Sequence, residues 1–417
     1  MPDGDAGGAG VIRRARPAGS GAGASVASDK GSGILRTTLK RWLAAAARRG
    51  VGPLRAGVGV LAVRAGGGRP VRLLLVSDGV NYTSEQQFAP FKRFAGPLRR
   101  ELGLVTRFMR TEDAARKPAR FFRRFDLVGL KVSFRADVAA SGRLARAIRD
   151  AIGGTGTRLF YFDGDDDLNV QRPDLLALSD RYVKKHAYRD RAEYGVPRIG
   201  KSNLTDWVAR ERGWSFADNE IPATPPLDPA LAARIVVGWN IGLDDKIADL
   251  ARTLPPPSPA PRPVDVCSRA VTAPENWIHP LRDPVARTLE GMADRFRVLV
   301  PHGRVGQDEY YAEMLRSTIC VSPFGYGELC WRDFEAILCG CLLVKPDMGH
   351  AETAPDIFVP GVTYAPCRWD YADLPEVCAR WLADDEGRRR VVERAHAVLR
   401  ESLTAAWFIE RLRGVLA

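Results

Sequence analysis

The sequence predicts an α/β protein with two Rossmann-like, doubly wound domains, preceded by a disordered basic N-terminal segment. Three observations predict this fold class. Apolar strand-like runs alternate with amphipathic helical patterns along most of the 417 residues, which is typical of parallel sheets covered by helices. A proline-rich stretch, residues 254–264 (LPPPSPAPRPV), divides this alternation into two series. A chain of this length also exceeds what a single hydrophobic core usually serves.

The first series, residues 70–253, opens with Val71–Ser77 (VRLLLVS), a continuous apolar run that predicts a strand buried on both faces. In a doubly wound domain, ligands are expected at the carboxyl ends of the strands. The further predicted elements are a helix at 91–102, strands at 105–110 and 125–133, a helix at 138–152 and a strand at 157–162.

The second series, residues 265–417, restarts the alternation after the proline-rich linker. Its predicted elements are strands at 264–268, 296–301 and 319–322 and helices at 281–294, 374–383 and 386–403. Residues 407–412 could form a terminal helix that crosses back to the first domain.

The segment from Ser322 to Thr353 (SPFGYGELCWRDFEAILCGCLLVKPDMGHAET) carries most of the functional information. A glycine-bearing loop opens an amphipathic helix, an apolar strand follows, and a second polar loop closes the segment. This order presents backbone N–H groups to a phosphate. The glycines favour that interpretation, because they cluster where a backbone turns sharply or approaches a ligand.

Three charged side chains in this segment, Glu328, Arg332 and Glu335, recur at i, i+4 and i+7. They share one helix face if the helix begins near Glu328. Two carboxylates with a guanidinium between them can hold vicinal hydroxyls and an anion together, because Arg donates a rigid fork and carboxylates accept. The alternative is an exposed ion pair that contributes only a few tenths of a kcal/mol.

The run Arg332-Asp-Phe-Glu-Ala-Ile-Leu-Cys-Gly-Cys-Leu-Leu-Val-Lys-Pro resembles the C-terminal donor-binding half of GT-B glycosyltransferases, in the variant found in exostosin-like and bacterial family 1-type enzymes. The resemblance covers about thirty residues. It implies two Rossmann-like domains facing a cleft, with a nucleotide-sugar bound by the second domain. The spacing departs from the family pattern at one point: Glu328 and Glu335 are separated by six residues, whereas many of these enzymes have seven.

The resemblance also implies roles for particular residues. Glu335 would bind the ribose hydroxyls of the donor, and Arg332 would face its diphosphate together with the backbone of Gly325, Tyr326 and Gly327. Glu328 carries over weakly because of the altered spacing. Further donor-binding candidates are His350 and Thr353 in the loop 347–353, and the cations Arg269 and Arg304, with His302, after strands of the second domain.

An acidic run, Asp163-Gly-Asp-Asp-Asp, directly follows the predicted strand at 157–162. Three interpretations stay open: a solvated acidic turn, a Mn²⁺ or Mg²⁺ site built on Asp163 and Asp165, or an aspartate that acts as general base on the acceptor hydroxyl. The residues 180–190 (DRYVKKHAYRD) form a basic cluster with His186. It could meet a diphosphate or an anionic acceptor, or form one solvated helix face. We take Asp163, Asp165 and His186 as the catalytic candidates, with no ground for choosing among them.

The net charge of +12 is concentrated in the leader. Residues 1–70 hold 12 Lys and Arg and 3 Asp, a net charge of +9, so the other 347 residues carry only +3. That distribution disfavours a nucleic-acid-binding role, which needs a basic face on a folded module. Residues 1–69 are predicted to be a low-complexity leader. Within it, residues 34–49 are either a short basic amphipathic helix on an anionic membrane surface or a poorly packed leader.

Seven cysteines, all at Cys267 or beyond and without a CxxC pair, predict reduced thiols and no zinc site. We therefore predict a cytoplasmic glycosyltransferase, with peripheral membrane contact through residues 34–49 as an option. It would need no metal or other cofactor, and would take a nucleotide-sugar donor and a glycan or lipid-linked acceptor. The alternatives are a metal-dependent transferase that uses Asp163 and Asp165, and a non-catalytic carbohydrate-binding protein.

Overall fold

The computed structural model describes residues 60, 63, 69–79, 85–216, 221, 223–270, 274–300, 303 and 305–417. The described part belongs to one compact unit, Gly50–Ala417. The predicted leader helix at 34–49 lies outside the described residues, as do the candidates His302 and Arg304.

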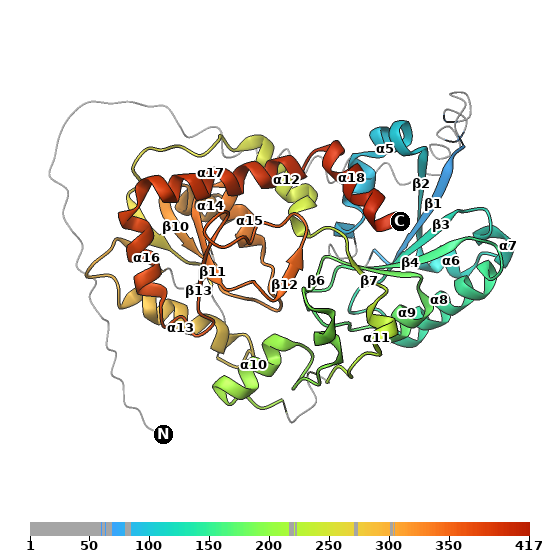
Figure 1. The fold of residues 1–417 in the computed structure, drawn as a ribbon, viewed down its shortest axis with the longest axis horizontal. Coiled ribbons are helices and arrows are strands. Elements are labelled where there is room, and N and C mark those ends of the chain that lie inside the picture. Colours follow the sequence, from blue (N-terminus) through green and yellow to red (C-terminus); the bar gives the residue numbers. More distant parts are fainter. Residues whose placement is uncertain are drawn as a thin grey trace, which may run out of the picture. The chain divides into compact units, whose positions relative to one another are not determined.

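The first sheet has six parallel strands in the order β2-β1-β3-β4-β5-β7 (Figure 1). Its strands are β1 (Val71–Ser77), β2 (Leu104–Arg110), β3 (Leu127–Lys131), β4 (Arg158–Asp163), β5 (Arg181–Lys184) and β7 (Ile235–Val237). The helices of this region are α4 (Ala89–Arg93), α5 (Ala95–Leu102), α6 (Thr111–Ala115), α7 (Ala119–Phe122), α8 (Val138–Ile152), α9 (Pro173–Leu178), α10 (Asn203–Arg212), α11 (Pro229–Ala232) and α12 (Asp245–Thr253). Short 3₁₀ turns occur at Arg191–Gly195 and Ile241–Leu243.

The apolar run of β1 explains why this sheet is covered on both faces. Successive side chains of a strand point to opposite faces. Leu74 and Val76 accordingly belong to one hydrophobic cluster, and Leu73 and Leu75 belong to another. All four are at most 1% exposed, as expected for a parallel sheet with helices on both sides.

The second sheet has five parallel strands in the order β13-β11-β10-β8-β9. They are β8 (Val264–Cys267), β9 (Val298–Leu299), β10 (Ser317–Val321), β11 (Leu342–Pro346) and β13 (Ala365–Cys367). The helices of this region are α13 (His279–Glu290), α14 (Gln307–Leu315), α15 (Trp331–Leu338), α16 (Leu374–Ala383) and α17 (Asp385–Ser402). Two parallel, doubly wound sheets confirm the predicted fold class.

The last helix, α18 (Ala405–Leu416), packs on the first sheet and not on the second (Figure 1). Its buried residues, Phe408, Ile409, Leu412 and Val415, join the cluster that contains Leu73 and Leu75 of β1. The Phe408 ring contacts the rings of Phe91 and Trp239, with centroids 5.4 Å and 4.9 Å away. Residues of α18 therefore form one hydrophobic core with residues of β1, more than 300 positions earlier in the sequence.

A two-stranded antiparallel sheet joins the two regions. It pairs β6 (His186–Tyr188), which follows β5, with β12 (Ala351–Thr353), which follows β11 (Figure 1). In this register His186 lies opposite Thr353. The interpretation of residues 180–190 as a solvated helix is therefore wrong, because this segment forms β5 and β6, and Lys184, Lys185 and His186 are at most 1% exposed.

In the part of the chain that the structure describes, no helix combines the length and apolar character needed to cross a bilayer.

Candidate active site

The glycine loop between β10 and α15 differs from the sequence prediction in where its helix begins. The helix α15 starts at Trp331, so Glu328 precedes it. Asp333 fixes this start because its carboxylate accepts the backbone N–H of Cys330 at 2.9 Å, an N-terminal cap. The prediction that Glu328, Arg332 and Glu335 share one helix face is therefore wrong.

Arg332 lies in a buried polar network under the glycine loop. Its guanidinium donates to the carbonyl oxygen of Arg269 at 2.6 Å, to Ser322 Oγ at 3.1 Å and to the carbonyl oxygen of Pro323 at 3.4 Å. These acceptors are neutral and belong to the loops after β8 and β10. Arg332 thus ties the carboxyl ends of two strands together, and its positive charge stays at that edge of the sheet.

Asp333 joins this network through Ser322, whose Oγ accepts from Arg332 Nε and donates to Asp333 Oδ1. It pairs with Lys345 Nζ at 3.1 Å, and both side chains are fully buried. Because burying a charge is costly unless it is paired, this ion pair fixes α15 against β11.

Glu335 has three side-chain partners. Its carboxylate accepts the phenol O–H groups of Tyr310 at 2.9 Å and Tyr311 at 3.0 Å, and Lys246 Nζ lies 2.6 Å from Oε1. A carboxylate offers about four acceptor positions, so about one remains for a ligand. Among the cation candidates, Arg269 is paired with Glu313, at 2.5 Å from Nη2 to Oε1.

Glu328 occupies the point where the two sheets are joined. Its side chain is fully buried; Oε2 accepts from His186 Nε2 at 3.2 Å, and Oε1 lies 3.7 Å from His350 Nε2 without a hydrogen bond. Burial alone would raise the pKa of Glu328, but the interactions with His186 and His350 outweigh it and lower the pKa. Burial lowers the pKa of His186, against the raising effect of Glu328. The site thus holds an ionised carboxylate beside a neutral imidazole.

The glycine loop also meets the acidic run directly. A Cβ atom on Gly327 would lie 1.8 Å from the carbonyl oxygen of Asp166, so only glycine fits there. At Gly325 the restriction is weaker, because a Cβ atom there would lie 2.8 Å from Arg282 Nη2, the end of a flexible side chain. Tyr326, between them, is 49% exposed, and its hydroxyl accepts from Asn276 Nδ2 at 2.8 Å.

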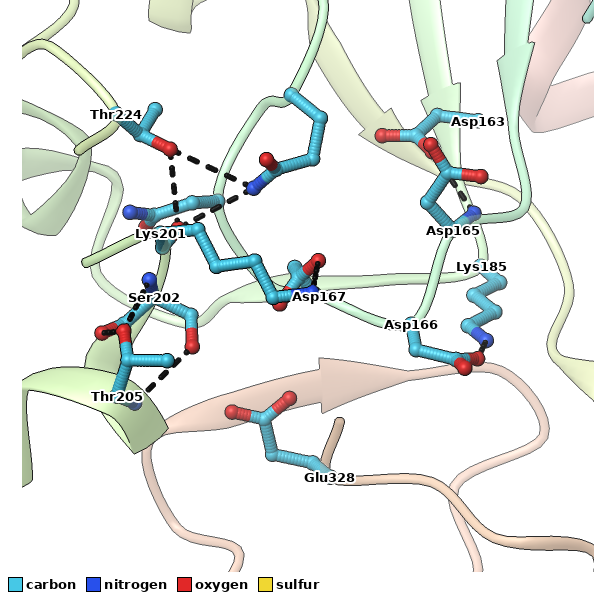
Figure 2. Close-up of polar contacts among 12 residues, drawn as sticks. Asp163, Asp165, Asp166, Asp167, Lys185, Lys201, Ser202, Thr205, Thr224 and Glu328 are labelled. Atoms are coloured by element: carbon cyan, nitrogen blue, oxygen red, sulfur yellow. Dashed lines mark hydrogen bonds and ion pairs between the residues drawn. The ribbon is translucent and has the colours of Figure 1, made fainter. Parts of the chain in front are cut away.

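The acidic run is not a solvated turn, because each of its four aspartates pairs with a different lysine. Figure 2 shows two of these pairs, Asp166–Lys185 and Asp167–Lys201. The lysines come from three places in the chain, Lys131, the adjacent Lys184 and Lys185, and Lys201, which the sequence alone does not connect. The pairs are Asp163–Lys184 at 2.6 Å, Asp165–Lys131 at 3.2 Å, Asp166–Lys185 at 2.5 Å and Asp167–Lys201 at 3.0 Å.

Asp163 and Asp167 respond differently to burial. Burial raises the pKa of Asp163, but Lys184 and Lys131 outweigh it and lower the pKa. For Asp167 burial dominates and, with Asp166 and Glu328 nearby, raises the pKa to about 7 despite Lys201. Sequence reasoning selected Asp163 and Asp165 of this run but neither Asp166 nor Asp167. No local pattern separates Asp167 from its neighbours, because its environment is set by distant residues.

The predicted candidates fall into two groups. His186, Glu328, His350 and Thr353 gather at the β6–β12 ladder, where the His350 ring also packs against Trp369 at 5.1 Å. Arg269, Arg332 and Glu335 lie around α14 and α15 of the second sheet. Within the described residues, no group of three or more His, Cys, Asp or Glu side chains is arranged to hold a metal ion.

Comparison with known proteins bears on the second sheet and its helices. Residues 274–414 match a family model described as glycosyl transferase-like. The C-terminal region, about a third of the chain, is therefore similar to a glycosyl transferase-like family. This confirms the resemblance predicted for the donor-binding half, which includes the glycine loop, Arg332 and Glu335. No curated protein matches the sequence at a significant level.

Similar solved structures include an alpha-glucosyltransferase in complex with UDP-glucose and DNA, with 10% identity, a TM-score of 0.44, and coverage of 83% of this chain and 99% of that one. Another is an alpha,alpha-trehalose-phosphate synthase (UDP-forming) from Burkholderia vietnamiensis, with 12% identity, a TM-score of 0.45 and coverage of 84% and 97%. A third is a glycosyltransferase from Rickettsia africae ESF-5, with 11% identity, a TM-score of 0.43 and coverage of 83% and 97%.

Proposed function

We propose that this protein transfers a sugar from a nucleotide-sugar donor to a hydroxyl acceptor without a metal ion, in the synthesis of a surface glycan or polysaccharide. The observation that carries the proposal is the buried Glu328 carboxylate, which lies where the loop after β10 meets β6 and keeps Oε1 without a hydrogen bond. A buried acceptor atom without a partner is costly. A sugar hydroxyl at this position would satisfy it.

The donor would lie across the carboxyl ends of β8, β10 and β11. Arg332 supports this because its guanidinium donates to the neutral oxygens of Ser322, Arg269 and Pro323, so its charge is available to a diphosphate. Glu335 would accept a ribose hydroxyl at its remaining acceptor position, with Tyr310 and Tyr311 holding its orientation. The backbone of residues 325–327 would approach the phosphates, and His350, Thr353, Arg269 and Arg304 remain further donor-side candidates.

Metal independence is supported by the state of the acidic run. Asp163 and Asp165, the ligands of the metal-dependent alternative, already pair with Lys184 and Lys131. A divalent cation would have to displace two buried ammonium groups. In a metal-free transferase, fixed cations such as Arg332 stabilise the departing diphosphate instead.

The acceptor would be a glycan or a lipid-linked sugar that enters from the side of the first sheet. We place the reaction in the cytoplasm, with residues 34–49 as a contact for an anionic membrane surface.

The proposed function is tested by thermal unfolding with a panel of nucleoside diphosphates and nucleotide-sugars, with and without EDTA. A nucleotide at about 100 times its Kd stabilises by roughly 2.7 kcal/mol. We expect a shift that survives EDTA, is lost in Glu335→Ala, and persists in Glu376→Ala, which removes an exposed glutamate on α16. A shift abolished by EDTA would favour the metal-dependent alternative. Sugar binding without turnover of any nucleotide-sugar would favour the carbohydrate-binding protein.

A further inference from the structure

We propose that Asp167 is the catalytic base that takes the proton from the acceptor hydroxyl, and that the transfer inverts the anomeric configuration. The proposal rests on the proposed function and names the residue that it leaves open. It is carried by the position of the Asp167 carboxylate next to the contact between Asp166 and Gly327, and by its one unpartnered oxygen.

Asp167 differs from the other aspartates of the run in how its oxygens are used. It is 4% exposed; Oδ2 accepts from Lys201 Nζ at 3.0 Å, and Oδ1 is buried without a hydrogen-bond partner. Asp163 has both oxygens occupied, by Lys184 Nζ at 2.6 Å and by the backbone N–H of Asp165 at 2.9 Å. Asp167 is therefore the buried aspartate of this run with an oxygen free to accept a proton.

The Asp167–Lys201 pair is held in place by its surroundings (Figure 2). Ser202 and Thr205 form a reciprocal capping box at the start of α10, directly after Lys201. The carbonyl oxygen of Lys201 accepts from Thr224 Oγ1 at 3.1 Å and from Gln171 Nε2 at 3.2 Å. This support fixes the backbone that carries the ammonium, and so orients the carboxylate without occupying Oδ1.

The charged groups that face Asp167 come from three elements. Lys201 lies before α10, Asp166 precedes Asp167 in the acidic run, and Glu328 belongs to the loop after β10. The two carboxylates and burial oppose ionisation of Asp167, while Lys201 favours it. The balance places the pKa of Asp167 at about 7. A general base works best when its pKa is close to the working pH, because it is then partly deprotonated and still basic enough to take a proton.

His186 is the rival base, because Glu328 holds its Nε2 and leaves Nδ1 without a partner. Its side chain is fully buried within the β6–β12 ladder, opposite Thr353, so an acceptor would reach it only if that ladder opened. Asp167 lies outside any strand, in an irregular loop, and its partner Lys201 is partly exposed. Lys201 is 23% exposed, its Nζ lies 5.9 Å from the Trp277 ring centroid, and Trp277 packs on the exposed Tyr326 at 6.1 Å.

The step balances without a further reactant. The acceptor oxygen forms a bond to the anomeric carbon of the donor sugar, and its proton passes to Asp167 Oδ1. The bond from the anomeric carbon to the phosphate oxygen breaks, and the nucleoside diphosphate leaves with that electron pair. Attack opposite to the leaving group inverts the anomeric configuration.

The test measures nucleoside diphosphate release from UDP-glucose, UDP-N-acetylglucosamine or GDP-mannose, whichever gives the largest thermal shift, with water and an aryl glycoside as acceptors. We expect Asp167→Asn to lower the rate by about 10²–10⁴-fold while keeping the thermal shift. Asp174→Asn is the matched control and should keep the rate: Asp174 is a partly exposed aspartate in the first turn of α9, paired with Arg172. The anomer first released, read by proton NMR, should be inverted.

A second variant changes the pKa of Asp167 while keeping its carboxylate. Lys201→Met deletes the cation beside Asp167, which should move the acid limb of the pH–rate profile to higher pH; Asp167→Asn should abolish that limb.

Three results would overturn the assignment while leaving the proposed function intact. The first is turnover of Asp167→Asn within about threefold of wild type, and the second is a product with retained anomeric configuration. The third is loss of turnover in His186→Gln but not in Asp167→Asn. A wild-type protein that binds none of the three nucleotide-sugars would overturn both.

Discussion

His186 Nε2 donates a hydrogen bond of 3.2 Å to Glu328 Oε2, across 142 positions of sequence and between two fully buried side chains. The bond joins the short strand β6 to the loop that precedes α15. Ionisation of Glu328 therefore depends on contact between the two parts of the fold. A carboxylate exposed to water is stabilised in its ionised form by hydration, whereas the buried Glu328 depends on the hydrogen bond from His186.

Removal of the imidazole should therefore destabilise the protein. His186→Ala leaves an ionised carboxylate buried, with only His350 at 3.7 Å. Breaking a buried charged pair costs about 3–5 kcal/mol, and we expect a loss near the lower limit because the imidazole is neutral. Urea unfolding followed by fluorescence measures it. His350→Ala, which removes a 25% exposed side chain, is the control and should cost less; equal losses would contradict the assigned geometry.

Gly327→Ala should disrupt the contact between the glycine loop and the acidic run. The added methyl group would lie 1.8 Å from the Asp166 carbonyl oxygen, a backbone atom that cannot turn away. We expect turnover to fall at least tenfold, with a loss of about 1–3 kcal/mol in stability. Gly414→Ala is the control: a methyl group there meets nothing within 4 Å, and alanine in a helix should stabilise by about 0.5–1 kcal/mol. Wild-type turnover in Gly327→Ala would show that this contact is unimportant.

Asp167 should make stability depend on pH near neutrality. Its folded pKa, about 7, is above the ordinary value of 3.8, so its contribution is fully present below about pH 4 and is lost as pH rises through 7. Between pH 6 and pH 8 this single group should lower the free energy of unfolding by about 1.4 kcal/mol. Asp167→Asn should lack that slope in guanidinium titrations at the two pH values. Parallel slopes in the variant and wild type would exclude an elevated pKa.

Phe408→Ala should destabilise the first sheet from the other end of the chain. Phe408 is fully buried and contacts the rings of Phe91 and Trp239, so we expect a loss of about 3–5 kcal/mol. Arg413→Ala, on the exposed face of the same helix, should change stability by less than about 0.5 kcal/mol. Hydrogen exchange should show the extra loss of protection in β1. Loss confined to α17 and α18 would mean that α18 is not part of this core.

The fold was predictable where local pattern decides structure. The helices at 138–152 and 374–383 have the predicted bounds, because their apolar spacing is helical and their ends carry clear signals. The strands β5 and β6 were not predicted, since the run DRYVKKHAYRD is charged. Its lysines are buried only because Asp163 and Asp166 lie opposite them, about twenty residues earlier.

The site was predictable only in part, for the same reason. Family resemblance pointed to Glu328 and His350, but the shared helix face was wrong because a cap at Asp333 delays the helix to Trp331. Asp167 could not be distinguished from its three neighbours, because Lys201 and Glu328 determine its chemistry from distant positions.

The placement of α18 has a consequence for synthesis on the ribosome. The strands of the first sheet emerge early, but the aromatic pocket formed by Phe91, Phe94 and Trp239 is covered only when residues 405–416 have left the exit tunnel. Until then the nascent chain exposes those rings, and a partly made first domain is a substrate for chaperones. Translation of the second region therefore sets the time at which the first becomes native.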